Sequence, residues 1–238
     1  MKIDLYGDGI GTVELIQSMG EDITIVNAAR VSFGKQKEVM DDKDKKLVKY
    51  LIRHQHTSTL EHNLVTFRFV VPLFVRSQHH RHRTWSFNEI SRRYTAEDIT
   101  FYEPPDFRTQ SKSNRQASNL NQKINPIIWP DLSDTDHGIT ASEAMASHHK
   151  ASMELYNKLM AEGVCREQAR GVLPQNMYTQ YFGTCNLNNL IKFVNLRTHS
   201  GAQWEIQRVA IGCLEIVESL WPITIKSYRD IKKLPDTK

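Results

Sequence analysis

Three stretches of the chain repeat hydrophobic residues every three or four positions, the spacing of a helix with one buried face. The first covers residues 41–56, with acidic residues in its first turn and histidines in its last. The second runs from 142 to 161 and the third from 202 to 220. The expected core positions are Leu47, Val48, Leu51 and Ile52 in the first helix, Met145, His148, Ser152, Leu155 and Leu159 in the second, and Ile206, Val209, Cys213, Leu214 and Val217 in the third.

Helix boundaries are expected where capping residues stand. Asp22 is a suitable N-cap for a helix that continues through Ala29, and Ser142 is a suitable N-cap for the helix of residues 142–161. Gly163 follows that helix and is well placed to end it, because glycine adopts the left-handed conformation of a helix terminus.

Shorter helical segments are expected around the prolines. Pro72 suits the first turn of a helix that leads to residue 82, after which the chain should become a loop. Residues 165–173 should form one or two turns that Pro174 halts, and residues 187–197 carry a further apolar stripe.

Alternating or β-branched segments predict strands at residues 2–6, 60–71 and 177–184, the last with Tyr178 and Phe182 as packing residues. Strands that intersperse with helices of mixed length favour an α+β fold with a small, mostly antiparallel sheet. No G-x-G-x-x-G follows a predicted strand, so a dinucleotide-binding Rossmann unit has no support.

Residues 101–140 have little periodicity and many prolines, serines and asparagines, so we expect an irregular insertion there. The 238 residues fit a single domain of residues 1–238. No apolar run approaches the roughly 20 residues that span a bilayer, and the first residues lack the form of a signal peptide. We therefore expect a cytoplasmic protein without a membrane partner.

Charge and cysteine usage narrow the classes of function. A net charge of +4 suits a local site for small anions better than a broad nucleic-acid interface. The three cysteines Cys165, Cys185 and Cys213 are odd in number and widely spaced, which argues against a disulfide framework and a C-x-x-C zinc site. We interpret all three as buried structural thiols, because a reactive thiolate needs a cationic, partly exposed setting.

The sequence RHRTWSFNEISRRY at residues 81–94 concentrates five basic side chains, Arg81, His82, Arg83, Arg92 and Arg93. Like charges repel unless anions neutralise them, and arginine matches phosphate geometry in a bidentate way. Serines and an asparagine in the same stretch add neutral hydrogen-bonding groups. The stretch therefore predicts a site for a ligand such as a nucleotide, and a solvated basic turn is the alternative.

The pattern R-H-R-x-x-S followed by N-E-x-S-x-R-Y resembles the signature of the flavin-dependent thymidylate synthases, and every fixed position is filled. VNAARVSF, HQHTSTLEH, CREQARGVLP, CNLNNLIKFVNLR and AQWEIQ are similar to further family segments. The resemblance implies conversion of dUMP to dTMP, with methylenetetrahydrofolate as carbon donor and NADPH as reductant through FAD. It also implies a homotetramer whose sites combine several subunits.

The resemblance assigns roles to residues of this sequence. It implies Arg197 as the catalytic arginine that polarises the uracil ring, and it places Glu61 near the cofactor and Ser91 and Arg93 nearest the nucleotide phosphate. The implied dUMP residues are Gln78, Arg81, Glu89, Ile90, Ser91, Arg92, Arg93, Arg170 and Arg197. The implied FAD residues are His56, Ser58, Arg81, His82, Arg83, Glu89, Asn186 and Asn188.

Two positions depart from the family pattern. Lys192 stands where the family often has an asparagine, and Gly201 stands where it often has a histidine beside the flavin. At these two positions we expect flavin affinity or ring stacking to differ from the family pattern.

Other interpretations remain open at the level of sequence. The histidines between residues 54 and 82 do not form an H-E-x-x-H motif, so a zinc hydrolase has little support and no metal is expected. Taken alone, Asn186 and Asn188 would be helix caps. Ser91 would be a nucleophile only if a base touched it. Basic residues interleaved with aromatic ones could instead bind nucleic acid.

Overall fold

The computed structural model describes residues 1–128 and 138–233, and it divides the chain into two compact units. Unit 1 comprises Met1–Val70, Gln78–Asn88 and Tyr181–Lys238, and unit 2 comprises Val71–Ser77 and Glu89–Gln180. The boundaries fall inside helices and strands rather than in linkers. We therefore keep a single domain for the whole chain as a proposal.

The strands are β1 (Lys2–Asp4), β2 (Thr12–Met19), β3 (Leu64–Pro72), β4 (Ser86–Glu89), β5 (Phe107–Gln110), β6 (Ser118–Ile124), β7 (Ile127–Ile128), β8 (Ile139–Thr140) and β9 (Tyr178–Asn186). The α-helices are α1 (Asp22–Arg30), α2 (Asp42–Arg53), α3 (Leu73–His79), α4 (Ala141–Ala161), α5 (Arg166–Ala169), α6 (Leu187–Arg197), α7 (Trp204–Leu220) and α8 (Pro222–Lys232). Short 3-10 segments occupy Val31–Phe33, Thr57–His62 and Arg170–Val172.

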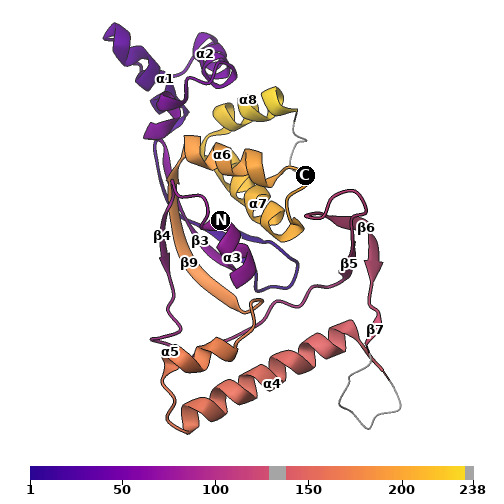
Figure 1. The fold of residues 1–238 in the computed structure, drawn as a ribbon. Coiled ribbons are helices and arrows are strands. Elements are labelled where there is room, and N and C mark those ends of the chain that lie inside the picture. The colour runs from indigo at the N-terminus through magenta and orange to yellow at the C-terminus, as the bar shows by residue number, and fades with distance from the viewer. Residues whose placement is uncertain (129–137, 234–238) are drawn as a thin grey trace. The chain divides into compact units, whose positions relative to one another are not determined.

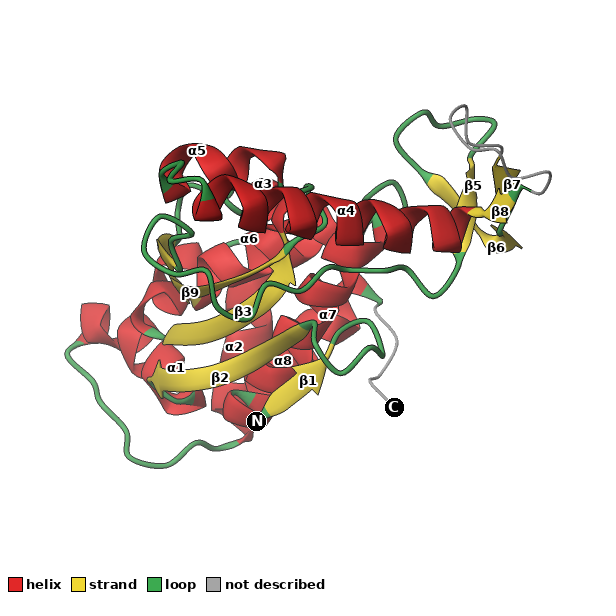
Figure 2. Ribbon diagram, turned by 90° about the horizontal axis from the view of Figure 1, so that it is seen from below, coloured by secondary structure: helices red, strands yellow, loops and turns green. Residues whose placement is uncertain are grey.

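Unit 1 is built on a five-stranded sheet in the order β1-β2-β3-β9-β4. Strands β1, β2 and β3 pair in antiparallel fashion, and Ile3 faces Val13 in the first pair. Figure 2 shows β1, β2, β3 and β9 side by side, and Figure 1 shows α6, α7 and α8 gathered on one face of this sheet. The α+β prediction with a small, mostly antiparallel sheet is confirmed.

Helix α7 supplies much of the core of unit 1. Its side chains at the predicted apolar positions are all buried, with Val209 and Cys213 fully so. Burying one such aliphatic chain stabilises the fold by about 1.5–3 kcal/mol. Gly212 lets α7 approach the sheet closely, since a Cβ there would lie 2.8 Å from a methyl group of Val13 and 3.0 Å from one of Leu5.

The start of α1 differs from the prediction. The N-cap is Glu21, and Asp22 is a buried residue whose carboxylate accepts hydrogen bonds from the backbone N–H groups of Ile223 and Thr224, at 3.0 and 2.9 Å. Asp22 therefore caps α8, a helix that the sequence did not predict, because two free N–H groups of that helix point at it.

Three boundaries near the signature also differ. The 3-10 segment Thr57–His62 includes Leu60, so β3 begins four residues later than expected. Pro72 ends β3, and α3 starts directly after it. The predicted loop after residue 82 contains β4, which pairs at the edge of the sheet beside β9. Phe182 on β9 is 44% exposed rather than packed, whereas Tyr178 is buried.

Unit 2 contains α4 and α5. The N-cap of α4 is Thr140 rather than Ser142, since a capping box forms between Thr140 and Glu143. The helix ends just before Gly163, at φ +85°, as predicted. Residues 165–173 form α5 and one 3-10 turn before Pro174, also as predicted.

The segment 101–140 was expected to be irregular, and this is wrong for about half of its described part, which forms strands. Strands β5 and β6 form an antiparallel pair, and β7 pairs with β8. Polar side chains cover the outside of the first pair, and this hid the strands from a search for hydrophobic alternation. Residues 129–137 lie outside the described part of the chain. In the described ranges, no helix combines the length and apolar character that a membrane crossing requires.

Candidate active site

The signature of residues 81–94 is divided between the two units. Residues up to Asn88 belong to unit 1, and residues from Glu89 onward belong to unit 2. The predicted site residues therefore fall into two groups, each with its own geometry.

In unit 1, Arg197 at the last position of α6 is held by two acceptors. Its Nε donates to Nε2 of His82 at 3.0 Å, and its Nη2 donates to the backbone carbonyl of Gln78 at 3.1 Å. Among the described residues, Nη1 has no hydrogen-bond partner. The structure thus brings three predicted residues into direct contact and leaves Nη1 of the guanidinium available for a ligand.

His82 can accept this hydrogen bond because it is neutral. Partial burial, with the positive charge of Arg197 beside it, lowers the pKa of His82 to about 4. At neutral pH its Nε2 therefore carries a lone pair, and its proton is on Nδ1. The neighbouring Arg197 is itself partly buried, and burial lowers its pKa, although an arginine stays charged at any physiological pH.

The side-chain amide of Gln78 is oriented by a relay that sequence reasoning missed. Its Nε2 donates to Oε1 of Gln203 at 2.5 Å, and Nε2 of Gln203 donates to a carboxylate oxygen of Glu205 at 2.9 Å. Glu205 is buried. Because a carboxylate only accepts, it fixes the direction of both amides. The A-Q-W-E-I segment was the sequence signal that could have identified these two residues.

Trp85 of the signature belongs to the core, whereas Tyr94 is 78% exposed and has the Arg93 guanidinium 5.9 Å from its ring centroid. Trp85 is buried and contacts the rings of Phe67, Phe69 and Phe193. The nucleic-acid alternative needs exposed rings, so Trp85 argues against it, and Tyr94 is the exposed ring of the signature.

His79 neighbours His82 in the same aromatic cluster, with the two ring centroids 6.2 Å apart. It is fully buried, and its Nδ1 is 2.9 Å from the hydroxyl of Tyr181. Burial, with His82, His80 and Arg197 nearby, lowers the pKa of His79 well below its usual value. His79 is therefore a neutral packing residue under the site.

The predicted cofactor residues of unit 1 lie at the 3-10 segment Thr57–His62 and its N-cap His56, in the turn between α3 and β4, and at the start of α6. Asn186 is the N-cap of α6, as one interpretation of the sequence expected. Asn188 is buried and is not a cap, since its Nδ2 donates to Glu61 at 2.8 Å. The exposed members of this set are His56, Ser58, Arg81 and Arg83.

In unit 2, a cavity of about 580 Å³ gathers most of the remaining predicted residues. Five predicted residues line it: Glu89, Ile90, Ser91, Arg92 and Arg170. Its wall also contains Arg76, Glu167 and Thr179, which were not predicted because no sequence pattern marks them.

Two arginines of this group already have protein partners. Arg92 is buried, and it donates to the backbone carbonyls of Glu97 at 2.6 Å and Asp98 at 3.4 Å. These bonds fix the position of the loop after β4. Arg93 is exposed and pairs loosely with Glu167 at 3.9 Å; it does not line the cavity.

Neither serine nor cysteine chemistry is favoured by the described part of the chain. Ser91 Oγ accepts from the backbone N–H of Arg93 at 3.3 Å, and it contacts no base among the described residues. Cys185 and Cys213 are buried, and burial raises the pKa of both thiols well above the usual value. The prediction was wrong for Cys165, which is exposed because it stands at the N-cap of the short helix α5.

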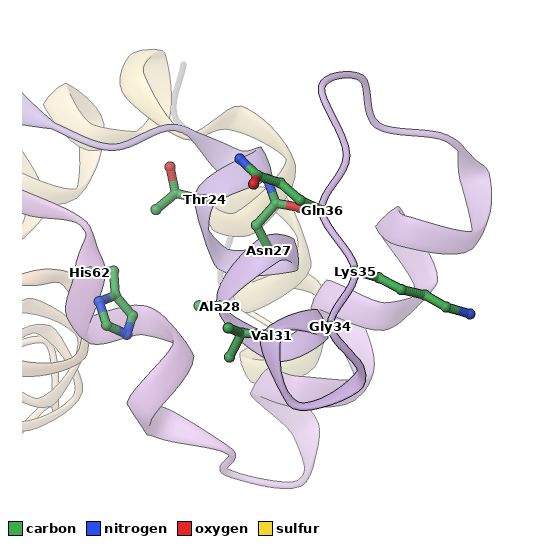
Figure 3. A pocket seen from close by; sticks show the side chains of 8 residues that line it. All are labelled: Thr24, Asn27, Ala28, Val31, Gly34, Lys35, Gln36 and His62. Atoms are coloured by element: carbon green, nitrogen blue, oxygen red, sulfur yellow. The ribbon is translucent and has the colours of Figure 1, made fainter.

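A second cavity, of about 460 Å³, lies in unit 1 between α1 and the segment that follows it. Figure 3 shows Asn27, Val31 and His62 around it, with the Lys35 side chain pointing away. No residue predicted for dUMP or FAD lines it. Within the described ranges, no cluster of three or more potential ligands could hold a metal ion.

Comparison with known proteins agrees with this fold. The family model described as "Thymidylate synthase complementing protein" matches residues 14–223. A flavin-dependent thymidylate synthase of Thermus thermophilus is 39% identical over 223 residues, covering 92% of this chain and 76% of the relative. One from Thermosipho melanesiensis is 37% identical over 224 residues, covering 92% and 90%.

A solved structure shows the same likeness in three dimensions. The UMP/dUMP methylase PolB of Streptomyces cacaoi, bound with 5-Br dUMP, superimposes with a TM-score of 0.76 at 32% identity, covering 92% of this chain and 95% of the other. The fold and the filled signature thus define an enzyme of the thymidylate synthase class. The chain belongs to the flavin-dependent thymidylate synthase family.

Proposed function

We propose that this protein converts dUMP to dTMP, with methylenetetrahydrofolate as carbon donor and NADPH as reductant through FAD. Family membership supports the reaction, and the arrangement of Arg197 carries it. The guanidinium is fixed by a neutral His82 and by the Gln78 carbonyl, with Nη1 still available. A fixed cation of this kind stabilises negative charge that develops on a uracil ring.

The unit 1 residues fit a flavin dinucleotide by the chemistry of their donors. Arg81 and Arg83 are exposed, and neither forms an ion pair or hydrogen bond among the described residues. Two such guanidinium groups match a pyrophosphate. We propose that they hold FAD together with His56, Ser58, His82, Glu89, Asn186 and Asn188. When bound, the flavin supplies the hydride.

The unit 2 cavity is the proposed site for the nucleotide. Its volume of about 580 Å³ is that of a small-molecule site. We propose that Glu89, Ile90, Ser91, Arg92 and Arg170 contact dUMP there, with Ser91 and Arg93 nearest the phosphate. We assign Gln78, Arg81 and Arg197 to the uracil ring and its surroundings. In a homotetramer with shared sites, the two groups need not come from one chain.

The proposed chemistry uses electrostatic activation instead of a protein thiolate. Arg197 polarises the ring carbonyl and favours loss of the ring N–H proton, so that C5 gains the electron density needed to attack the methylene carbon. Burial of the Cys185 and Cys213 thiols supports this choice, because a neutral thiol is a poor nucleophile.

The test is an assay on the purified protein reconstituted with FAD. We expect a yellow protein whose flavin absorbance bleaches with NADPH, and tritium release from 5-tritiated dUMP only when methylenetetrahydrofolate is present. A parallel assay with UMP is warranted, because the similar methylase is named for both nucleotides. A protein that stays colourless, takes up no FAD and gives no heat with dUMP would refute the proposal.

We also propose that the protein is a cytoplasmic homotetramer that uses dUMP, folate and NADPH and binds neither nucleic acid nor membrane. Multi-angle light scattering should give four times the chain mass of 27.6 kDa. A monomer that is fully active would contradict the shared sites.

A further inference from the structure

Arg76 is a cation in the unit 2 cavity to which no role has been assigned. Helix α3 places it in the cavity wall, with its side chain 30% exposed. Its Nε lies 3.2 Å from Oε1 of Glu89, as an ion pair that lacks hydrogen-bond geometry. The two Nη groups have no other partner among the described residues. Arg76 thus faces Glu89 and is otherwise unpaired.

The same carboxylate oxygen has a second contact on the other side. The hydroxyl of Thr179 donates to Oε1 of Glu89 at 2.7 Å. The backbone is fixed nearby, because the N–H of Ile90 donates to the carbonyl of Gln180 at 2.9 Å. Oε1 is therefore held between α3 and β9, while Oε2 has no hydrogen bond among the described residues.

The other arginines in the wall have hydrogen-bond partners other than Glu89. The guanidinium of Arg92 binds two backbone carbonyls, and Nε of Arg170 donates to the carbonyl of Glu167 at 3.3 Å. Arg76 is the arginine that balances the charge of Glu89. Without Arg76, the negative charge of Glu89 would be uncompensated and would repel an anionic ligand in the cavity.

We propose that Arg76 is a positioning residue for the uridine nucleotide. Together with Thr179 it holds the Glu89 carboxylate in one orientation, so that Oε2 accepts a hydroxyl or N–H of the bound nucleotide. This inference rests on the proposed function, since it takes dUMP as the ligand of the cavity. It differs from a direct phosphate contact, in which Arg76 would act independently of Glu89.

A double-mutant cycle distinguishes these two roles. The dissociation constant of dUMP would be measured by calorimetry for the wild type, Arg76→Ala, Glu89→Gln and the double variant. We expect Arg76→Ala to weaken dUMP binding about tenfold, the factor for losing the charge-assisted hydrogen bond from the nucleotide to Oε2 of Glu89. In the Glu89→Gln background the same change should add less than twofold, because the partner through which Arg76 acts is already altered.

Controls separate positioning from folding. Arg115→Ala removes an exposed arginine of the same unit outside the cavity and should leave the dissociation constant unchanged. If Arg76→Ala lowers the melting temperature, Arg76→Gln keeps most of the side-chain stem and is used in its place.

Additive effects of the two substitutions, or unchanged binding in the folded Arg76 variant, would overturn the inference. A wild-type protein that binds no dUMP would instead overturn the proposed function.

Discussion

Nε of Arg197 donates a hydrogen bond to Nε2 of His82 at 3.0 Å, which joins the end of α6 to the signature. The bond exists only while His82 is neutral, and burial beside Arg197 keeps it neutral by lowering its pKa to about 4. The charge of Arg197 thus helps to keep His82 neutral, and the neutral His82 in turn orients Arg197.

Replacing Arg197 tests the centre of this arrangement. Arg197→Ala should lower kcat roughly 100- to 1000-fold, the range for losing a preorganised charge in an active site. The melting temperature should change little, because the side chain is only partly buried. Tritium release from dUMP measures the first quantity and circular dichroism the second. Equal turnover in Arg197→Ala and in the Arg115→Ala control would show that another group activates the ring.

The lowered pKa of His82 predicts acid sensitivity. In the unfolded chain this histidine binds a proton near pH 6.5, whereas in the folded protein it does so only near pH 4. The free energy of unfolding is therefore greatest above pH 6.5 and falls as the pH drops from 6.5 towards 4. The buried His79 acts in the same direction.

Thermal melts between pH 7.5 and 4.5 measure this dependence. The double variant His79→Phe, His82→Gln should show a flatter profile than the wild type, since glutamine still offers Arg197 an acceptor but does not titrate. An unchanged slope would assign the acid sensitivity to other groups.

The relay behind Gln78 predicts an indirect effect on the nucleotide. Gln203→Leu should weaken dUMP binding several-fold, because Gln78 loses the acceptor that sets the direction of its amide. Gln207→Leu removes an amide from the same helix that bonds only backbone carbonyls, and it is a suitable control. Calorimetry compares the two, and equal affinities would show that the relay is structural alone.

The cysteines should differ sharply in reactivity. In the native protein, one thiol, that of the exposed Cys165, should react rapidly with Ellman's reagent, and the buried pair should react only after unfolding. Cys165→Ser and Cys213→Ala should both retain turnover, although Cys213→Ala should cost roughly 1 kcal/mol of core packing. Loss of turnover in a folded cysteine variant would contradict electrostatic activation.

Asp44 is expected to matter for stability rather than activity. It is buried at the start of α2, where it pairs with Arg30 and, at 2.6 Å, with Lys37. Asp44→Asn should cost about 1–2 kcal/mol, a discounted value because both partners are partly exposed. Asp42→Asn, on the exposed side of the helix, should leave the urea midpoint unchanged. Equal urea midpoints for the two variants would show that the buried ion pairs of Asp44 do not raise the free energy of unfolding.

Periodicity predicted that α2, α4 and α7 exist, and it predicted the buried face of α7 correctly. On α4 it was wrong for His148 and Leu155, which are exposed, because the buried face is shifted by one residue to His149 and Tyr156.

Periodicity missed β2, whose alternation is interrupted by a register shift between Leu15 and Gln17 and whose Ile16 and Met19 are exposed. It also assigned Asp22 to its own helix, since no local pattern reveals a carboxylate that caps a helix 200 residues away.

The candidate site, like the fold, was predicted in part. The signature led to His82 and to four of the predicted cavity residues, and the similar segments CREQARGVLP and CNLNNLIKFVNLR led to Arg170 and Arg197. Arg76, Gln203 and Glu205 were missed because only the folded chain shows what each one touches. Cys165 was wrongly taken as buried because its neighbours suggested a helix interior, whereas it lies at the entry to α5.

The bond between Asp22 and the start of α8 has a consequence for synthesis on the ribosome. In a nascent chain that has emerged only as far as β3, the Asp22 carboxylate lacks the two N–H groups of α8 that donate to it in the folded protein. The sheet of such a chain also lacks β4 and β9. Unit 1 can close only when the final sixty or so residues have left the exit tunnel. Premature termination before Pro222 should therefore yield an aggregating fragment rather than a shortened enzyme.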